Sequence, residues 1–230
     1  MMVAVFASLL LQTAATLPPP LDHARQAYQE GAVQRAIDEA GGWVTSHPTD
    51  PTGYADLGIY VRQMGVITGS SAQLARAVRL FAKALELHTT RSDSAIDHGN
   101  IGSTYIELGE FASAQRHLDE AYRLSDRLYY KVRAAYSMAR AGLFTSAIAR
   151  VQPITVSQLA GADSPGNEGL TAVNISLIYA LAKQPANAVS WLRIAESQSP
   201  GRYVKWARND RDFALIHNST ELRAFLSSPQ

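Results

Sequence analysis

The stretch from His98 to Tyr122 constrains the fold more than any other part of this sequence, because it predicts two short amphipathic helices joined by a tight turn at Gly109. Small residues occupy the positions at which the two helices must approach closely: Gly102, Ala114 and Ala121. Larger residues fill the space between the helices: Ile101, Tyr105 and Leu118. Such a hairpin cannot bury its apolar face alone, so we expect neighbouring hairpins of the same kind.

A recurring small residue supports this expectation. It follows each expected turn by five positions and falls at Ala36, Ala77, Ala114, Ala147 and Ala188. The spacings are 41, 37, 33 and 41 residues, and an apolar slot lies four residues further on. That slot holds Ala40, Phe81, Leu118, Val151 and Leu192. Turn glycines coincide with the register at Gly31, Gly109 and Gly142. We therefore predict an all-α chain of about five stacked helical hairpins.

The composition is that of a folded chain of one domain. Of 230 residues, 47% are hydrophobic and 18% are charged, which excludes wholesale disorder. The formal net charge of +1 supplies no electrostatic footprint for nucleic acid, so no nucleic-acid partner is expected. The absence of cysteine excludes disulfides, thiolate nucleophiles and cysteine-based zinc sites.

The N-terminus predicts export. Residues 3–11 form an apolar run that contains only one polar residue, Ser8, and Thr13 and Ala15 fit the small-residue rule of a cleavage site. We therefore assign residues 1–15 to a signal peptide and residues 16–20 to a proline-rich spacer, which leaves no membrane span in the mature chain. A periplasmic or secreted protein of a bacterium is expected. The alternative is a cytoplasmic protein whose N-terminal helix packs on the first repeat, because the segment before the apolar run has no Lys or Arg.

Local signals place several helix ends. Asp50 and Pro51 predict an N-cap followed by proline at the first helical position, in a helix that ends near Gln63. Residues 65–70 have the composition of a loop. The segment Ser94–Asp97 matches a capping box that would start the next helix. Residues 158–169 form the clearest loop of the chain.

No short catalytic or phosphate-binding motif occurs in the sequence. The densest group of possible acid–base residues or metal ligands is His88, Asp93, Asp97 and His98. Asp97 and His98 are adjacent on a helix, so their side chains diverge by about 100° and cannot easily share one metal. Asp93 and Asp97 suit the positive end of a helix dipole. We therefore predict no catalytic residue, no metal ligand, no cofactor and no enzymatic activity.

Three segments of the chain resemble a known family of repeat proteins. The stretch His98–Tyr122 resembles a tetratricopeptide repeat unit, and Tyr54, Leu57 and Gly58 resemble the start of another, where the family has an aromatic residue followed by Leu-Gly. The closing segment Trp191–Leu226 resembles the terminal unit of some repeat proteins.

The resemblance covers residues 21–226 and implies a right-handed α–α superhelix with a short helical C-terminal cap. Residues 21–230 would form this repeat domain. In the family the first helix of each unit lines a concave groove, which implies a set of partner-binding candidates: Asn100, Ser103, Glu107, Arg133, Tyr136, Arg140 and Asn174. For Tyr136, packing between repeats is an equal alternative.

Some members of the family hold a partner's C-terminal carboxylate with a clamp of Lys, Asn and Arg. Asn100 and Arg133 match two of its five positions, whereas Ala55, Ile59 and Tyr129 do not match the others. A clamp without its lysines would lose most of its charge-assisted hydrogen bonds, so we do not predict that activity.

The expected function is a non-catalytic scaffold that binds a peptide or a partner protein in the groove. One alternative is a ligand-sensing or enzymatic repeat protein with a pocket near residues 158–169. Another is a structural subunit of an oligomer. The identity of the partner and the oligomeric state do not follow from the sequence.

Overall fold

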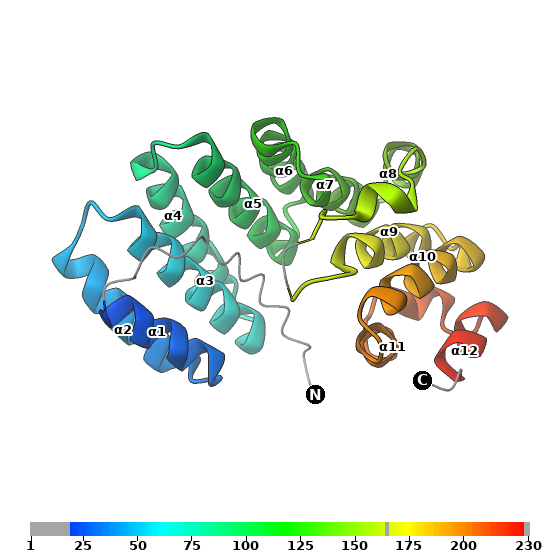
Figure 1. Ribbon diagram of the computed structural model, residues 1–230, viewed down its shortest axis with the longest axis horizontal. Helices are drawn as coiled ribbons and strands as arrows, with labels where there is room; N and C mark the ends of the chain where they lie inside the picture. Colours follow the sequence, from blue (N-terminus) through cyan, green and yellow to red (C-terminus); the bar gives the residue numbers. More distant parts are fainter. Residues whose placement is uncertain (1–18, 164–165, 228–230) are drawn as a thin grey trace. The chain divides into compact units, whose positions relative to one another are not determined.

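The computed structural model describes residues 19–163 and 166–227, which form two compact units (Figure 1). Unit 1 extends to Ser125, and unit 2 begins at Asp126. The predicted signal peptide, residues 1–15, lies outside the described residues. The first described helix begins at Pro19, two residues before the expected start of the repeat domain, because proline is well suited to the first turn of a helix.

Unit 1 consists of three antiparallel helical hairpins in its described part (Figure 1). Its helices are α1 (Pro19–Gln29), α2 (Val33–Ser46), α3 (Pro51–Thr68), α4 (Ser71–Leu87), α5 (Arg91–Leu108) and α6 (Phe111–Ser125). Each helix packs on the next along the chain, and the first helices also contact one another, α1 with α3 and α3 with α5. The first helices therefore form one continuous layer of the unit.

Unit 2 contains two further hairpins and a helical cap in its described part. Its elements are α7 (Leu128–Arg140), α8 (Phe144–Val151), the 3₁₀ turn η1 (Val156–Leu159), α9 (Leu170–Leu181), α10 (Pro185–Gln198), α11 (Arg202–Ala207), the 3₁₀ turn η2 (Phe213–Ile216) and α12 (Thr220–Ser227). Helix α7 packs on α8 and α9, and α10 packs on α9, α11 and α12. The cap packs on the last hairpin and contains an aromatic cluster, in which the ring of Trp206 contacts both Tyr203 and Phe213.

The predicted register of small residues is confirmed in both units. All five alanines are fully buried, as is every residue of the apolar slot four positions later: Ala36, Ala77, Ala114, Ala147, Ala188, Ala40, Phe81, Leu118, Val151 and Leu192. Small side chains let the two helices of a hairpin approach, and the slot residues fill the space beside the crossing.

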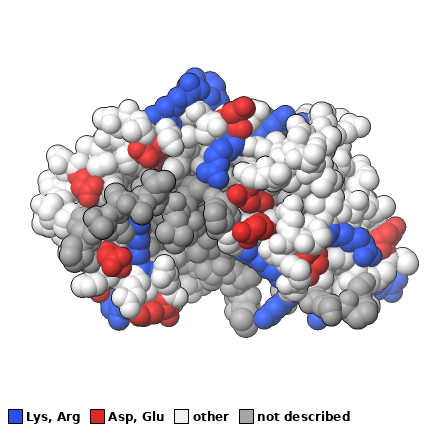
Figure 2. Space-filling model, viewed as in Figure 1, with Lys and Arg blue, Asp and Glu red and all other residues white. Residues whose placement is uncertain are grey.

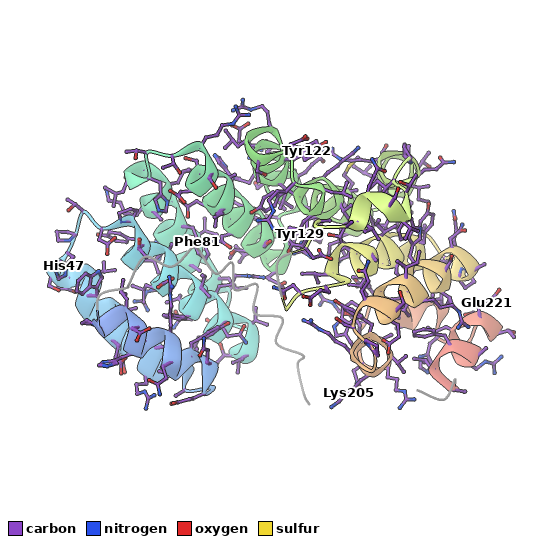
Figure 3. The ribbon with its side chains drawn as sticks, in the orientation of Figure 1. His47, Phe81, Tyr122, Tyr129, Lys205 and Glu221 are labelled. Carbon is purple, nitrogen blue, oxygen red and sulfur yellow. The ribbon has the colours of Figure 1, made fainter. Side chains whose placement is uncertain are left out.

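Glycine makes two of these crossings closer than alanine would permit. A Cβ atom on Gly58 of α3 would lie 2.6 Å from the ring of Phe81, which projects from α4 between the two helices (Figure 3). A Cβ atom on Gly102 of α5 would lie 2.6 Å from Leu118 Cγ and 3.0 Å from the carbonyl oxygen of Ala114. Both glycines therefore permit the close approach of the two helices, and neither has the positive φ angle for which glycine is usually needed.

Two sequence-based expectations about helix ends are wrong. Helix α3 continues through residues 65–68 to Thr68, where we expected a loop, because Gly65 is buried against Leu74 of α4 at a distance that excludes a Cβ atom. Helix α5 begins at Arg91 rather than near the expected capping box, because the hydroxyl of Thr90 accepts the backbone N–H of Asp93 and caps the helix one turn earlier. The expected cap of α3 is confirmed: Asp50 accepts the backbone N–H of Thr52 at 3.0 Å.

Within the ranges that the structure describes, none of the helices combines the length and the apolar character needed to cross a membrane.

The glycine crossing gives a prediction about stability. We expect Gly102→Ala to destabilise the protein by about 1–3 kcal/mol, because the added methyl group meets a fully buried side chain and a backbone oxygen that cannot yield. Gly42→Ala is the matched control, since Gly42 is an exposed helical glycine with open space around it, and this change should stabilise by about 0.5–1 kcal/mol. Urea unfolding of the two variants measures both effects, and equal shifts in the same direction would contradict the close crossing.

Candidate functional site

The first helices of unit 1 carry a buried ion pair. Arg25 of α1 donates from Nε to Asp56 Oδ2 of α3 at 2.9 Å and from Nη2 to Oδ1 at 3.2 Å. The side chain of Asp56 is only 8% exposed. Burial raises the pKa of Asp56 more than the hydrogen bonds from Arg25 lower it. The pair therefore fixes the spacing of α1 and α3 at a cost in desolvation.

About two turns further along α3, polar groups lie near the neighbouring first helix. Arg62 Nη2 lies 3.9 Å from Oε1 of Glu107 on α5, a long contact between a guanidinium that is 19% exposed and a carboxylate that is 34% exposed. Beside it, Gln63 is 8% exposed. Arg62 Nε and Gln63 Nε2 are buried and have no hydrogen-bond partner among the described residues. This surface of unit 1 thus carries hydrogen-bonding groups that the described part of the unit leaves unused.

The other two groove candidates of unit 1 are buried on α5. Asn100 is 8% exposed and Ser103 is 7% exposed. The carbonyl oxygen of Asn100 accepts the hydroxyl of Thr104 at 2.7 Å within the helix. Glu107 is therefore the most accessible of the three candidates in this unit.

In unit 2 the structure joins two of the candidates directly. Arg133 of α7 donates from Nη1 to the side-chain oxygen of Asn174 on α9 at 3.1 Å. The amide of Asn174 in turn donates to the carbonyl oxygen of Leu170 at 2.7 Å, which fixes its orientation. Arg133 Nε is buried without a hydrogen-bond partner among the described residues. The guanidinium also lies 5.3 Å from the ring centre of Tyr136, within the range of a cation–π contact.

The other two candidates of unit 2 are occupied by the C-terminal cap. The hydroxyl of Tyr136 donates to Asp212 Oδ2 at 2.5 Å, and Asp212 comes immediately before η2. Arg140 Nη1 lies 3.1 Å from the same hydroxyl and 3.5 Å from the same carboxylate oxygen. Burial, with a smaller contribution from the charge of Asp212, raises the pKa of Tyr136, so its hydroxyl stays protonated and donates. These two side chains therefore hold the cap on the last hairpins.

Sequence reasoning missed Asp56, Gln63, Arg62 and Asp212. The first two share repeat positions with residues that were identified: Asp56 lies two residues before the small residue of its helix, like Asn100, and Gln63 lies five residues after it, like Glu107. Extending the register to α3 would have found them. Asp212 has no such signal, because it lies in the cap and not in a repeat.

The group of His88, Asp93, Asp97 and His98 does not converge on one site. His88, directly after α4, contacts fully buried Asp97 of α5 with Nδ1 2.5 Å from Oδ2, and this pair joins the two hairpins. Burial lowers the pKa of His88, but the hydrogen bond and charge of Asp97 outweigh that effect and raise it overall. In the described residues no set of three or more His, Cys, Asp or Glu side chains could hold a metal ion.

The described part of the loop of residues 158–169 forms hydrogen bonds and close contacts with neighbouring elements of unit 2. Asp163 accepts the backbone N–H of Thr171 at 3.0 Å and the hydroxyl of Thr171 at 2.5 Å, which ties the loop to the start of α9. Gly169, at the end of the loop, packs closely against Ala195 and Tyr203. On the face shown in Figure 2, basic and acidic residues are interspersed among uncharged ones.

The fold defines a class of helical-hairpin repeat protein, and comparison with solved structures identifies that fold as the tetratricopeptide repeat. No protein-family model and no curated protein matches the sequence. The structure is similar to TTC0263, a thermophilic TPR protein of Thermus thermophilus, with 16% identity, a TM-score of 0.60 and coverage of 86% of this chain and 97% of that chain. It is also similar to PilW, a widely conserved type IV pilus biogenesis factor, with 16% identity, a TM-score of 0.59 and coverage of 90% and 97%. The predicted resemblance in fold is confirmed.

The His88–Asp97 pair predicts a pH-dependent stability. Because the pKa of His88 in the folded protein is raised above its ordinary value of about 6.5, its contribution is fully present below that value and decreases as the pH rises through the raised pKa. We therefore expect His88→Gln to be more destabilising at about pH 6 than at about pH 9. Exposed His217 supplies the control His217→Gln. Thermal unfolding across this range measures the difference, and a pH-independent loss in His88→Gln would contradict the ion pair.

Proposed function

We propose that this chain is a non-catalytic protein-interaction module that binds a peptide or a segment of a partner protein on the surface of its first helices. The observation that carries the proposal is a pair of buried groups on α3, Arg62 Nε and Gln63 Nε2, that have no partner among the described residues. Each such group costs about 1–3 kcal/mol if it stays unsatisfied. A bound chain that supplies acceptors recovers this energy, and peptide carbonyl and carboxylate oxygens are such acceptors.

The contact set begins from the groove candidates: Asn100, Ser103, Glu107, Arg133, Tyr136, Arg140 and Asn174. Arg62 and Gln63 extend it in unit 1, since they lie beside Glu107 or share its repeat position. In unit 2 we assign direct contact to Arg133, whose Nε is unused by the described residues, and a positioning role to Tyr136 and Arg140, which are bound to Asp212. The fold supports this assignment within each unit, because neighbouring first helices contact one another there and present their side chains together.

The N-terminal sequence supports action outside the cytoplasm, in the periplasm or after secretion. The apolar run and the small residues at Thr13 and Ala15 fit a cleaved export signal. We expect the mature protein, isolated from the cells that make it, to begin at Thr16. N-terminal sequencing tests this, and an intact Met1 on the accumulated protein would contradict export.

The interaction proposal predicts a site-specific crosslink. A photoreactive amino acid placed at Glu107 in the full chain should capture a distinct partner in living cells, because Glu107 is the most accessible candidate next to the unused donors. The additional change Arg62→Glu should abolish that product, since it removes the donor and adds a repelling charge.

The matched control uses an ion pair on a second helix. Lys83 and Glu86 of α4 form a 2.9 Å pair that is well exposed. A photoreactive residue at Glu86 should not give the same product, and Lys83→Glu should leave the Glu107 crosslink unchanged. Equal capture from both positions, or a crosslink that survives Arg62→Glu, would contradict the proposed surface.

A further inference from the structure

Two histidines contact each other across the hairpin of α5 and α6 in unit 1. His98 projects from α5 and His117 from α6, and their Nδ1 atoms lie 3.0 Å apart. The ring centres are 5.1 Å apart with planes tilted by 38°, and Tyr105 lies against the ring of His117 at 5.7 Å. Both imidazoles are partly exposed, so solvent reaches the pair.

The surroundings of both rings favour the neutral form of imidazole. Burial lowers the pKa of His98, although the negative charge of Glu120 acts in the opposite direction. Burial, together with His98 itself and Arg116, lowers the pKa of His117 to about 4. Neutral imidazole is the form that binds metal ions.

The separation of the two nitrogen atoms matches a particular coordination geometry. With metal–nitrogen bonds of about 2.0–2.1 Å, a separation of 3.0 Å corresponds to a bond angle of about 90–100° at the metal. That is the angle between neighbouring ligands in tetragonal or octahedral coordination, whereas a tetrahedral ion would need the atoms to be about 3.3–3.4 Å apart. Imidazole ligands in tetragonal geometry are typical of Cu²⁺ and Ni²⁺.

We propose that His98 and His117 form a two-histidine binding site for a divalent transition-metal ion, with Cu²⁺ bound more tightly than Ni²⁺ or Zn²⁺. The order follows the general affinity series for nitrogen ligands. Within the described residues no third His, Cys, Asp or Glu completes the set, so water occupies the remaining positions. The ion links α5 to α6 and therefore stabilises the hairpin.

The proton balance of binding is defined. In the free pair one Nδ1 carries hydrogen and donates it to the other Nδ1. The ion takes both Nδ1 lone pairs, so the shared hydrogen moves to Nε2 of its own ring through solvent. Both rings then carry hydrogen on Nε2 and no net proton is released. Binding should therefore weaken when the rings become protonated.

This site differs from the combination of Asp97 and His98 that the sequence argues against. It was hidden in the sequence because 19 residues separate the two histidines, and the turn at Gly109 brings them together. The inference is independent of the proposed interaction surface, so either can fail alone.

The test titrates the full chain, freed of metal by a chelator, with Cu²⁺ alone, and repeats the titration with Ni²⁺ and Zn²⁺. We expect one Cu²⁺ per chain, electron paramagnetic resonance with nitrogen coupling, and a rise in the unfolding midpoint. His98→Gln and His117→Gln should each weaken binding by at least about tenfold, because losing a ligand costs no less than losing an outer-shell partner. His217→Gln in unit 2 should bind like the wild type.

The double variant His98→Gln/His117→Gln measures binding elsewhere on the chain. Equal Cu²⁺ affinity in wild type and double variant would overturn the proposal. A second measurement needs no variant: Cu²⁺ should broaden the imidazole resonances of His98 and His117 before those of the other four histidines. Broadening that begins at other histidines would overturn the proposal even if the variants fail to fold.

Discussion

The close crossing of the two helices in each hairpin is the constraint on which the rest of the structure depends. Alanine at one position and a fully buried slot residue four positions later recur in all five hairpins. At Gly58 and Gly102 the approach is closer than a Cβ atom would permit. Within each unit, the second helix of one hairpin also packs on the first helix of the next. Polar residues then remain on the first helices, which contact one another along unit 1.

The fold could be predicted because its determinants recur. A small residue followed four positions later by an apolar one recurs in every predicted hairpin and locates it even where single helices carry weak signals. The extension of α3 could not be predicted in this way, because composition favours a loop at residues 65–70 and only the contact between Gly65 and Leu74 shows why a helix is stable there. The start of α5 was misplaced for a related reason, since Thr90 and Ser94 are both acceptable caps and tertiary packing selects between them.

The candidate site could be predicted in part. Repeat position identifies which residues lie on the first helices, and in unit 2 the structure connects all four candidates through hydrogen bonds or ring contacts. What repeat position cannot supply is the partner of each side chain. Tyr136 and Arg140 bind Asp212, a cap residue 76 and 72 positions away, respectively, and no periodicity connects them. Likewise, the contact between His98 and His117 depends on which faces of α5 and α6 meet, and the sequence spacing does not give this.

The two units differ in how far their first-helix polar groups are already satisfied, and this difference bears on how a partner would bind. In unit 2, Asp212 neutralises Arg140, and Asn174 accepts a hydrogen bond from Arg133. The main new hydrogen bond that a ligand could form there is therefore the one to Arg133 Nε. In unit 1, the guanidinium of Arg62 meets Glu107 only at 3.9 Å, and the described residues leave its Nε unsatisfied, as they do the amide of Gln63. A hydrogen bond to a buried, unpaired donor contributes more than one that replaces an existing partner. Taken separately, the first helices of unit 1 should therefore offer a ligand stronger new hydrogen bonds than those of unit 2.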